Sequence, residues 1–102
     1  MKLSLECAAD DNSTVVTGEV YAHPVDDTAR PIVNMVVARN SYSALFSLPA
    51  GSWVYHFHVE GAGGQLTLTL KDLDDNATPI ASKIYDTRFG YYGKVFLFAV
   101  PA

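Results

Sequence analysis

The sequence has few of the features that mark disulfide-rich, membrane-spanning or nucleic-acid-binding proteins. Its single cysteine, Cys7, cannot form an intrachain disulfide, so the fold must be held by packing alone. The longest apolar runs, such as 95–101, are far shorter than the ~20 residues with which a helix crosses a bilayer. Seven Lys and Arg residues against eleven Asp and Glu residues leave a net charge of −4, which excludes a basic surface for phosphate backbones. We therefore expect neither nucleic-acid binding nor membrane insertion.

The first residues carry no recognisable export signal. Ser4 and Glu6 interrupt the apolar stretch that a signal peptide requires, and Glu6 stands directly before Cys7, where a lipidation site has small residues. Together with the missing disulfides, this favours a cytoplasmic location. Charged residues make up only 18% of the chain, below the roughly 25% of an average domain, which leaves a homo-oligomer open.

No stretch of the chain shows the helical 3.6-residue pattern, whereas apolar and polar residues alternate in many short runs. A length of 102 residues with 49% hydrophobic residues suits one domain that spans 1–102 and has a real core. Turn residues separate the runs, as is typical of an all-β protein. The sequence predicts a single-domain antiparallel β-sandwich of seven to eight strands, immunoglobulin-like or jelly-roll. The expected strands are 1–7, 14–22, 32–38, 42–48, 53–60, 65–71, 80–85 and 94–100.

The stretch 48–73 is expected to form one long β-hairpin around which the other strands pack. A turn at 61–64 would place Glu60 beside Gln65 and Phe57 opposite Leu68. In the same way, the turn at 10–13 would join the first two strands.

That second hairpin would set Cys7 opposite Val16. Gly18, inside the second strand, indicates a bulge or a close approach of another backbone. The strands 32–38 and 94–100 are apolar on both faces and are therefore predicted to be central. The expected core residues are Val36, Phe46, Trp53, Tyr55, Phe57, Leu66, Leu68 and Leu70.

Three potential metal ligands stand at alternate positions of the strand 53–60. His56, His58 and Glu60 would share one face, and two imidazoles with a carboxylate can bind iron, zinc or manganese. A His-x-His pair on a strand with a nearby Glu, preceded by Pro49 and Gly51, resembles the first motif of the cupins. That resemblance implies a metal-binding protein or metal-dependent enzyme, although Glu60 follows His58 more closely than in the family.

The alternative for these histidines is a polar outer face of the sheet, opposite Thr67 and Thr69. We prefer this alternative because Trp53, Tyr55 and Phe57 better fill the interior face. No cofactor is expected.

The segment 86–93, DTRFGYYG, is unusually rich in aromatic residues. Arg88, Phe89, Tyr91 and Tyr92, spaced by glycines, have the composition that binding loops favour. Aromatic rings with an arginine suit a carbohydrate ligand or a protein partner. The alternative is that these rings plug one end of the sandwich. We expect a non-catalytic binding module that uses this loop, with the metal site and a structural homo-oligomer subunit as alternatives.

Two further features bear on function. The acidic turns at 10–12 and 74–76 leave open a calcium site built from loop oxygens, although neither forms an EF-hand. The segment 46–57, in which an aromatic strand follows a Pro-x-Gly turn, resembles the strand entry of C1q/TNF-type jelly rolls. That resemblance implies a jelly roll and a symmetric oligomer.

Overall fold

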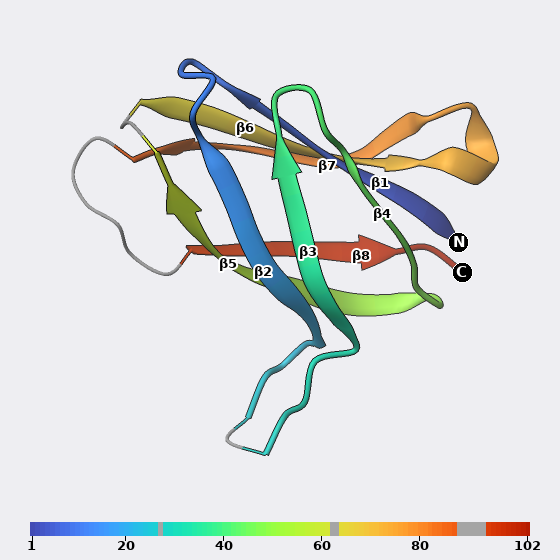
Figure 1. Ribbon diagram of the computed structural model, residues 1–102. Coiled ribbons are helices and arrows are strands. Elements are labelled where there is room, and N and C mark those ends of the chain that lie inside the picture. Colours follow the sequence, from blue (N-terminus) through green and yellow to red (C-terminus); the bar gives the residue numbers. More distant parts are fainter. Residues whose placement is uncertain (27, 62–63, 88–93) are drawn as a thin grey trace.

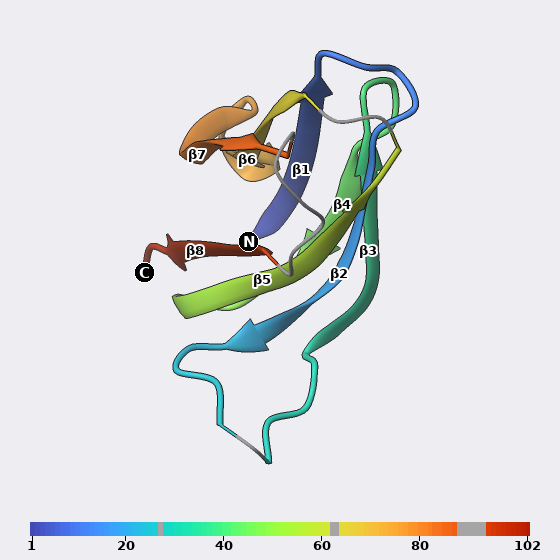
Figure 2. The same ribbon diagram turned by 90° about the vertical axis from the view of Figure 1, so that its left-hand side faces the viewer.

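The computed structural model describes residues 1–26, 28–61, 64–87 and 94–102, which form two antiparallel four-stranded sheets (Figure 1). One sheet has the strand order β4-β1-β6-β7 and the other β3-β2-β5-β8. In the turned view, β1, β6 and β7 lie in one layer and β2, β5 and β8 in the other (Figure 2). The predicted all-β sandwich is thereby confirmed. The elements are β1 (Lys2–Ala9), β2 (Val15–Ala22), β3 (Val33–Arg39), β4 (Ala44–Ser47), β5 (Gly51–Glu60), β6 (Gln65–Asp72), the 3-10 turn η1 (Leu73–Asp75), β7 (Thr78–Asp86) and β8 (Lys94–Val100).

The predicted hairpin across 48–73 is wrong, because β5 and β6 belong to different sheets. Glu60 lies opposite Val15 of β2, and Gln65 lies opposite Asp86 of β7. Both strands do bury the predicted faces, with Phe57 and Leu68 in the core. The alternation of apolar and polar residues is the same whether two strands are hydrogen-bonded in one sheet or face each other across the core, so it does not distinguish the two arrangements. The connection 61–64 is long enough to step between sheets that lie ~10 Å apart.

The predicted pairing of the first two strands is wrong for the same reason. Cys7 lies opposite Leu68, and Val16 lies between Ala38 and Val59. The turn after β1 thus crosses from one sheet to the other.

The strands β3 and β8, predicted to be central, are the two edges of their sheet. Their outer faces are apolar but uncovered, with Met35 75% and Leu97 56% exposed. A strand that is apolar on both faces is expected to have other elements packed on both faces, but within the described residues no strand or helix lies over these side chains.

The core lies between the two sheets and contains the predicted residues. All eight are buried except Phe46, which is half-buried at the margin. The Tyr55 hydroxyl donates a hydrogen bond of 2.7 Å to the Val36 carbonyl, which satisfies a polar group in the apolar interior. The predicted close approach of another backbone at Gly18 is confirmed, since a Cβ there would lie 2.0 Å from the His56 carbonyl oxygen.

Candidate functional site

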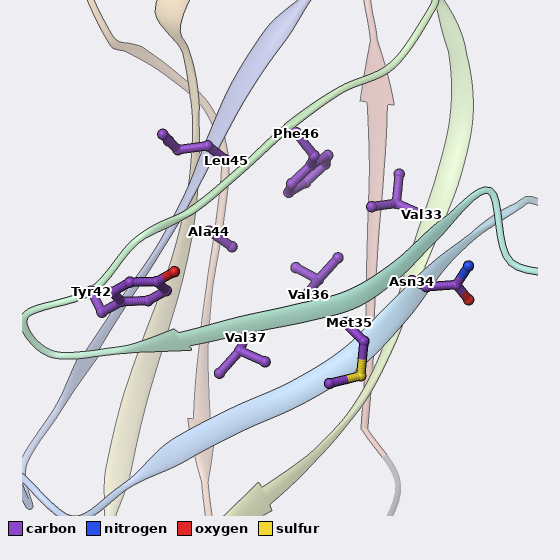
Figure 3. Close-up of a pocket in the computed structure, with 9 residues that line it drawn as sticks. All are labelled: Val33, Asn34, Met35, Val36, Val37, Tyr42, Ala44, Leu45 and Phe46. Carbon is purple, nitrogen blue, oxygen red and sulfur yellow. The ribbon is translucent and has the colours of Figure 1, made fainter.

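A hollow of about 210 Å³, lined mostly by apolar residue types, lies between β3 and β4, and we call it the β3–β4 groove (Figure 3). It forms because β3 and β4 are edge strands of the two sheets on the same side of the sandwich. The lining residues are Val33, Asn34, Met35, Val36, Val37, Tyr42, Ala44, Leu45 and Phe46.

The groove has a buried floor and an exposed rim. Val36 and Ala44 are buried, and in Figure 3 they point with Phe46 into the gap between the strands. On the rim, Met35 and Leu45 are 75% and 71% exposed, the two highest values for large apolar side chains among the described residues. Tyr42 is exposed as well. In Figure 3 the Met35 and Leu45 side chains lie on the sides of β3 and β4 that face away from the gap, so these exposed apolar side chains flank the groove from outside.

A tight turn joins β3 to β4 beside Tyr42, at one end of the groove (Figure 3). Arg39 and Tyr42 exchange two backbone hydrogen bonds of 3.0 and 2.9 Å. The Asn40 amide ties this turn to the end of β1, because it accepts a bond from the Ala9 N–H and donates one to the Ala9 carbonyl. The Arg39 guanidinium lies 5.9 Å from the centre of the Tyr42 ring, in a cation–π contact. The backbone of the turn that carries Tyr42 is therefore fixed, and Arg39 lines two neighbouring hollows instead of the groove.

A β-bulge in β3 sets the position of Met35. Asn34 and Met35 together lie opposite the single residue Glu19 of β2, so the register shifts by one residue. Met35 has a φ of 55°, a left-handed conformation that costs a non-glycine residue roughly 1–2 kcal/mol. This bulge interrupts the regular ladder of the edge at Met35, whose side chain lies on the side of β3 away from the gap (Figure 3).

Negative charge is present beside the groove although its own strands carry none. No Asp or Glu occurs between Thr28 and Val59. Strand pairing, however, places Glu19 opposite Met35, and Glu60 in the same cross-strand row as Arg39 with Val15 between them. Among the described residues no carboxylate lies within ion-pair distance of Arg39.

The predicted metal ligands lie on the outer face of β5, away from the core. His56, His58 and Glu60 are all exposed, and the closest pair, His58 Nε2 and Glu60 Oε1, is 3.7 Å apart. The His56 and Tyr21 rings instead form an edge-to-face contact, with their ring centres 5.5 Å apart. Within the described ranges, no group of three or more His, Cys, Asp or Glu side chains is arranged to hold a metal ion.

A second, shallower hollow of about 490 Å³ lies on the same outer face as His56. It combines apolar side chains of β5 and β8 with polar groups of the loop after β2. Its lining residues are His23, Pro24, Val25, Asp26, Val54, His56, Val95 and Leu97.

The predicted binding loop with Arg88, Phe89, Tyr91 and Tyr92 lies outside the described residues. The flanking Thr87 is buried, and its hydroxyl donates a hydrogen bond of 2.9 Å to the Gly64 carbonyl. The proposal that this loop binds a ligand stays a prediction.

The acidic turns use their carboxylates to bind backbone and side-chain donors within the chain. Asp11 accepts bonds from the Ser13 N–H and hydroxyl, which lower the pKa of its carboxyl group. Asp72 caps η1 by accepting from the Asp74 N–H at 2.9 Å. Asp74 in turn accepts from the Lys2 N–H at 3.0 Å. These contacts explain the acidic residues as turn formers, and the calcium site stays a prediction.

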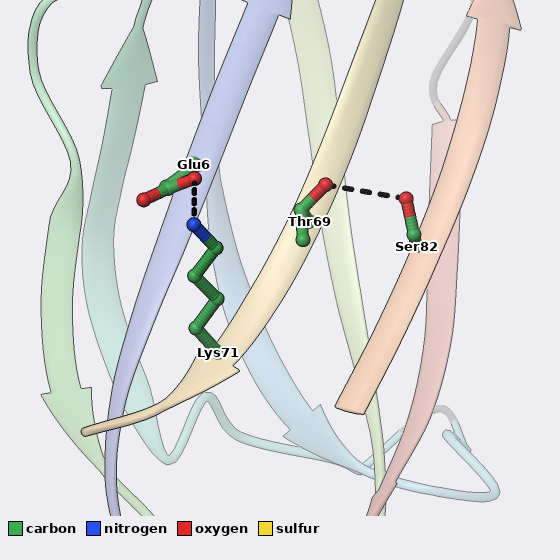
Figure 4. Close-up of polar contacts among 4 residues, drawn as sticks. All are labelled: Glu6, Thr69, Lys71 and Ser82. Atoms are coloured by element: carbon green, nitrogen blue, oxygen red, sulfur yellow. Dashed lines mark hydrogen bonds and ion pairs between the residues drawn. The ribbon is translucent and has the colours of Figure 1, made fainter. Parts of the chain in front are cut away.

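On the outer face of the β4-β1-β6-β7 sheet, polar side chains of neighbouring strands contact one another. Lys71 and Glu6 form an ion pair of 3.0 Å, and the hydroxyls of Thr69 and Ser82 lie 3.2 Å apart (Figure 4). Its two edge strands also carry exposed apolar side chains, with Leu45 of β4 71% and Ile84 of β7 65% exposed. The described part of the chain contains no helix with the length and apolarity that a membrane crossing requires.

No family model, curated protein or solved structure matches this chain. The function must therefore be argued from the site itself.

Sequence reasoning missed the β3–β4 groove, because Met35 was assigned to a central strand. The local signal for these edges is that both strands carry apolar residues at outward as well as inward positions, as at Met35 and Leu45.

Proposed function

We propose that the protein is a non-catalytic binding module that takes a protein partner on the β3–β4 groove. The observation that carries this proposal is that Met35 and Leu45, the most exposed large apolar side chains described, line the same hollow. Single exposed apolar residues are normal on protein surfaces, whereas a cluster around a hollow marks an interaction site.

The energetics of the rim support this proposal. Covering Met35 or Leu45 with a partner would contribute about 1–2 kcal/mol each, from the apolar area removed from water. Tyr42 and Arg39 are residue types that carry much of the binding energy in protein interfaces. Because the turn between them is already ordered by hydrogen bonds, binding would cost little backbone entropy.

The chemistry of the lining favours binding over catalysis. Of the nine lining residues, only Asn34 and Tyr42 have polar side chains, and the others are aliphatic or aromatic. Such a lining offers shape and apolar contact to a partner. The Arg88–Tyr92 loop, between β7 and β8 at the opposite edges of the sheets, stays a predicted second surface for a protein or carbohydrate ligand.

The test is the selection of binders from a displayed random peptide library by the wild-type protein. We expect enriched peptides whose binding falls at least about tenfold in Leu45→Glu, because a charge would enter the apolar rim. The matched control is Ile84→Glu, which changes a 65% exposed aliphatic residue on β7, the other edge of the same sheet. If the enriched peptides bind both variants equally, or if no peptide is enriched, the groove is not the binding surface.

A further inference from the structure

We infer that β8 is the contact strand of a weak homodimer, in which it pairs antiparallel with β8 of a second copy across a two-fold axis at Leu97. This inference goes beyond the proposed function, because β8 lies at the opposite edge of its sheet from β3. The features that support it are the direction of the β8 backbone groups, the side chains on both faces of the strand and the interruptions in the other sheet edges.

The backbone of β8 presents a row of hydrogen-bonding groups to the side away from β5. Ser52 of β5 directs its carbonyl to the β2 side, where it accepts the His23 N–H at 3.1 Å. Ser52 lies opposite Ala99, so this pair is not hydrogen-bonded and Ala99 directs both its backbone groups away from β5. Successive residues alternate in direction, so Val95 and Leu97 direct theirs to the same open edge.

The Tyr85 hydroxyl gives independent evidence for this direction. It reaches from β7 of the other sheet and donates a hydrogen bond of 2.7 Å to the Val95 carbonyl. A carbonyl oxygen has two lone pairs, so this group can still accept an N–H from another strand. Within the described ranges no strand lies beside the outer edge of β8. A second strand would therefore find donors and acceptors in a regular row.

The centre of β8 fixes the register in which the strand can pair with its own copy. β8 spans Lys94–Val100, so Leu97 is its middle residue. A two-fold axis there places Leu97 opposite Leu97 of the second copy, and Val95 opposite Ala99. All three residues with outward backbone groups then exchange N–H and C=O bonds. A shift of two residues in either direction places one of them opposite a residue outside β8.

The side chains that meet in this register are apolar on both faces. On the outer face, Leu97 and Val95 are 56% and 42% exposed, and they would be covered by Leu97 and Ala99 of the second copy. On the inner face, Phe96 would lie beside Phe98. Cross-strand pairs of this kind stabilise a sheet, and none of them brings like charges together.

The acidic residues nearest to β8 lie away from the contact strand. Neither β8 nor the β5 residues opposite it, 51–57, include Asp or Glu. Glu19 lies two strands from the edge, opposite His56, and its row would continue in the second copy through the uncharged Ala99. Asp26, on the loop beside Leu97, already accepts bonds of 2.8 and 2.7 Å from Thr28.

The other sheet edges do not offer an equivalent row of backbone groups. The register of β3 shifts at Met35, and β4 has only four residues. β7 contains Pro79, which lacks an N–H, and its register shifts beside that residue. Among the described edges β8 alone is uninterrupted, so the strand of a second copy that fits β8 is its own β8.

Pairing through β8 would leave both β3–β4 grooves open. The joined sheet would have the order β3-β2-β5-β8 followed by the same strands in reverse, with one groove at each far end. Such a dimer could hold two partner molecules, or one partner with two binding segments at increased avidity.

The test is sedimentation velocity of the wild type between about 10 μM and 1 mM. An edge-to-edge contact is small, so we expect a reversible dimer with a dissociation constant on the order of 100 μM. Leu97→Lys and Leu97→Glu should each remain monomeric, because residue 97 meets its own copy and like charges would face each other. An equimolar mixture of the two variants should dimerise, since opposite charges would then meet.

Ile84→Lys, at a 65% exposed aliphatic position of the β7 edge, is the matched control and should dimerise as the wild type does. Circular dichroism verifies that every variant is folded. A wild type that is monomeric up to about 1 mM overturns the inference, as does a dimer that persists in both Leu97 variants. A mixture that stays monomeric excludes the axis at Leu97. A dimer that dissociates in Leu45→Glu would place the contact at the β3–β4 edge instead.

Discussion

Gly18 occupies a position where the neighbouring strand leaves no space for a side chain. A Cβ there would lie 2.0 Å from the His56 carbonyl oxygen and 2.7 Å from the Phe57 Cα, both backbone atoms of β5. Because backbone atoms move only if the strands separate, we expect Gly18→Ala to lower the free energy of unfolding by about 2–3 kcal/mol. Urea unfolding followed by the fluorescence of Trp53 measures this change.

The neighbouring Thr17→Ala, at a half-buried position of the same strand, serves as the control for Gly18. It is expected to cost less than about 1 kcal/mol. Equal effects of the two substitutions would show that β2 and β5 separate easily at this point.

The Tyr55 hydroxyl is the polar group that the core satisfies internally. Its bond to the Val36 carbonyl is 2.7 Å long, and the Tyr55 side chain is almost completely buried. Tyr55→Phe leaves that carbonyl without this donor, and we expect a loss of about 1–2 kcal/mol in the free energy of unfolding. Tyr42→Phe removes a hydroxyl from an exposed ring and is expected to change stability by less than about 0.5 kcal/mol. Calorimetry of the two variants compares them, and a larger effect at Tyr42 contradicts this account.

Side-chain directions along each strand could be predicted from the sequence, because they depend on local alternation. The inward positions of Trp53, Tyr55 and Phe57 and the outward positions of His56 and His58 follow from a period of two residues. Val54 shows where this fails. It belongs to the outer face but is 2% exposed, because the loop 23–26 and β8 lie around it, and such long-range coverage leaves no local pattern.

At the scale of elements, three of the four edge strands carry features that hinder pairing with another chain. β3 has its bulge at Met35, and β4 has only four residues. β7 contains Pro79, an extra residue at Ile80 and the charged Lys83. Such features protect edges against aggregation. β8 is the exception, with seven residues, no bulge and a single charged residue at its start.

Tyr85 partly covers the β8 edge, because its hydroxyl donates to the Val95 carbonyl at 2.7 Å. That carbonyl therefore points away from β5. Since both backbone groups of a residue in an antiparallel strand point the same way, Leu97 and Ala99 also direct theirs to the free edge.

The exposed β8 edge predicts where the protein aggregates. Leu97→Lys places a charge at an exposed position of this edge, so we expect less aggregate after prolonged heating, measured by light scattering. The free energy of unfolding should change by less than about 1 kcal/mol. Ile84→Lys, on the already protected β7, is the control and should leave aggregation unchanged. Equal suppression by both variants would point to net charge as the cause.

Strand pairing could not be predicted from the sequence, unlike the existence of the strands. The connections 61–64 and 10–14 are short enough for hairpins, yet both cross between sheets. Pairing is decided by strands that are distant in the sequence, since β5 pairs with β2 and β8. The groove was missed for the same reason, because only the sheet order shows that β3 and β4 are edges.

At the scale of the whole molecule, buried acidic groups make stability sensitive to alkaline pH. Burial raises the pKa of Tyr85 to about 12, and it raises the pKa values of Tyr55 and Cys7 as well. An unfolded tyrosine has a pKa of about 10, so above this pH the unfolded chain releases protons that the folded chain retains. The free energy of unfolding is therefore constant for these tyrosines below pH 10 and falls as the pH rises toward 12.

Urea unfolding at a series of pH values between 8 and 12 tests this dependence. Each tyrosine that stays protonated in the folded state contributes a slope of about 1.4 kcal/mol per pH unit. Tyr85→Phe should reduce the slope by one such contribution. A free energy that stays constant up to pH 12 contradicts the burial of these hydroxyl groups.

The order of the strands also governs how fast the chain can fold. Only the pairs β2–β3 and β6–β7 consist of strands that are neighbours both in the sequence and in a sheet. β1 pairs with β4 and β6, and β5 pairs with β8, so these pairings form only after much later parts of the chain are present. Loops must therefore close over long stretches of chain before most contacts form, which typically slows folding to milliseconds or seconds. During synthesis, β1 remains without either partner strand until the chain has been extended from Ala9 to β4, which begins at Ala44. Over this interval the nascent chain exposes its aliphatic β1 face to chaperones and to other unfolded chains.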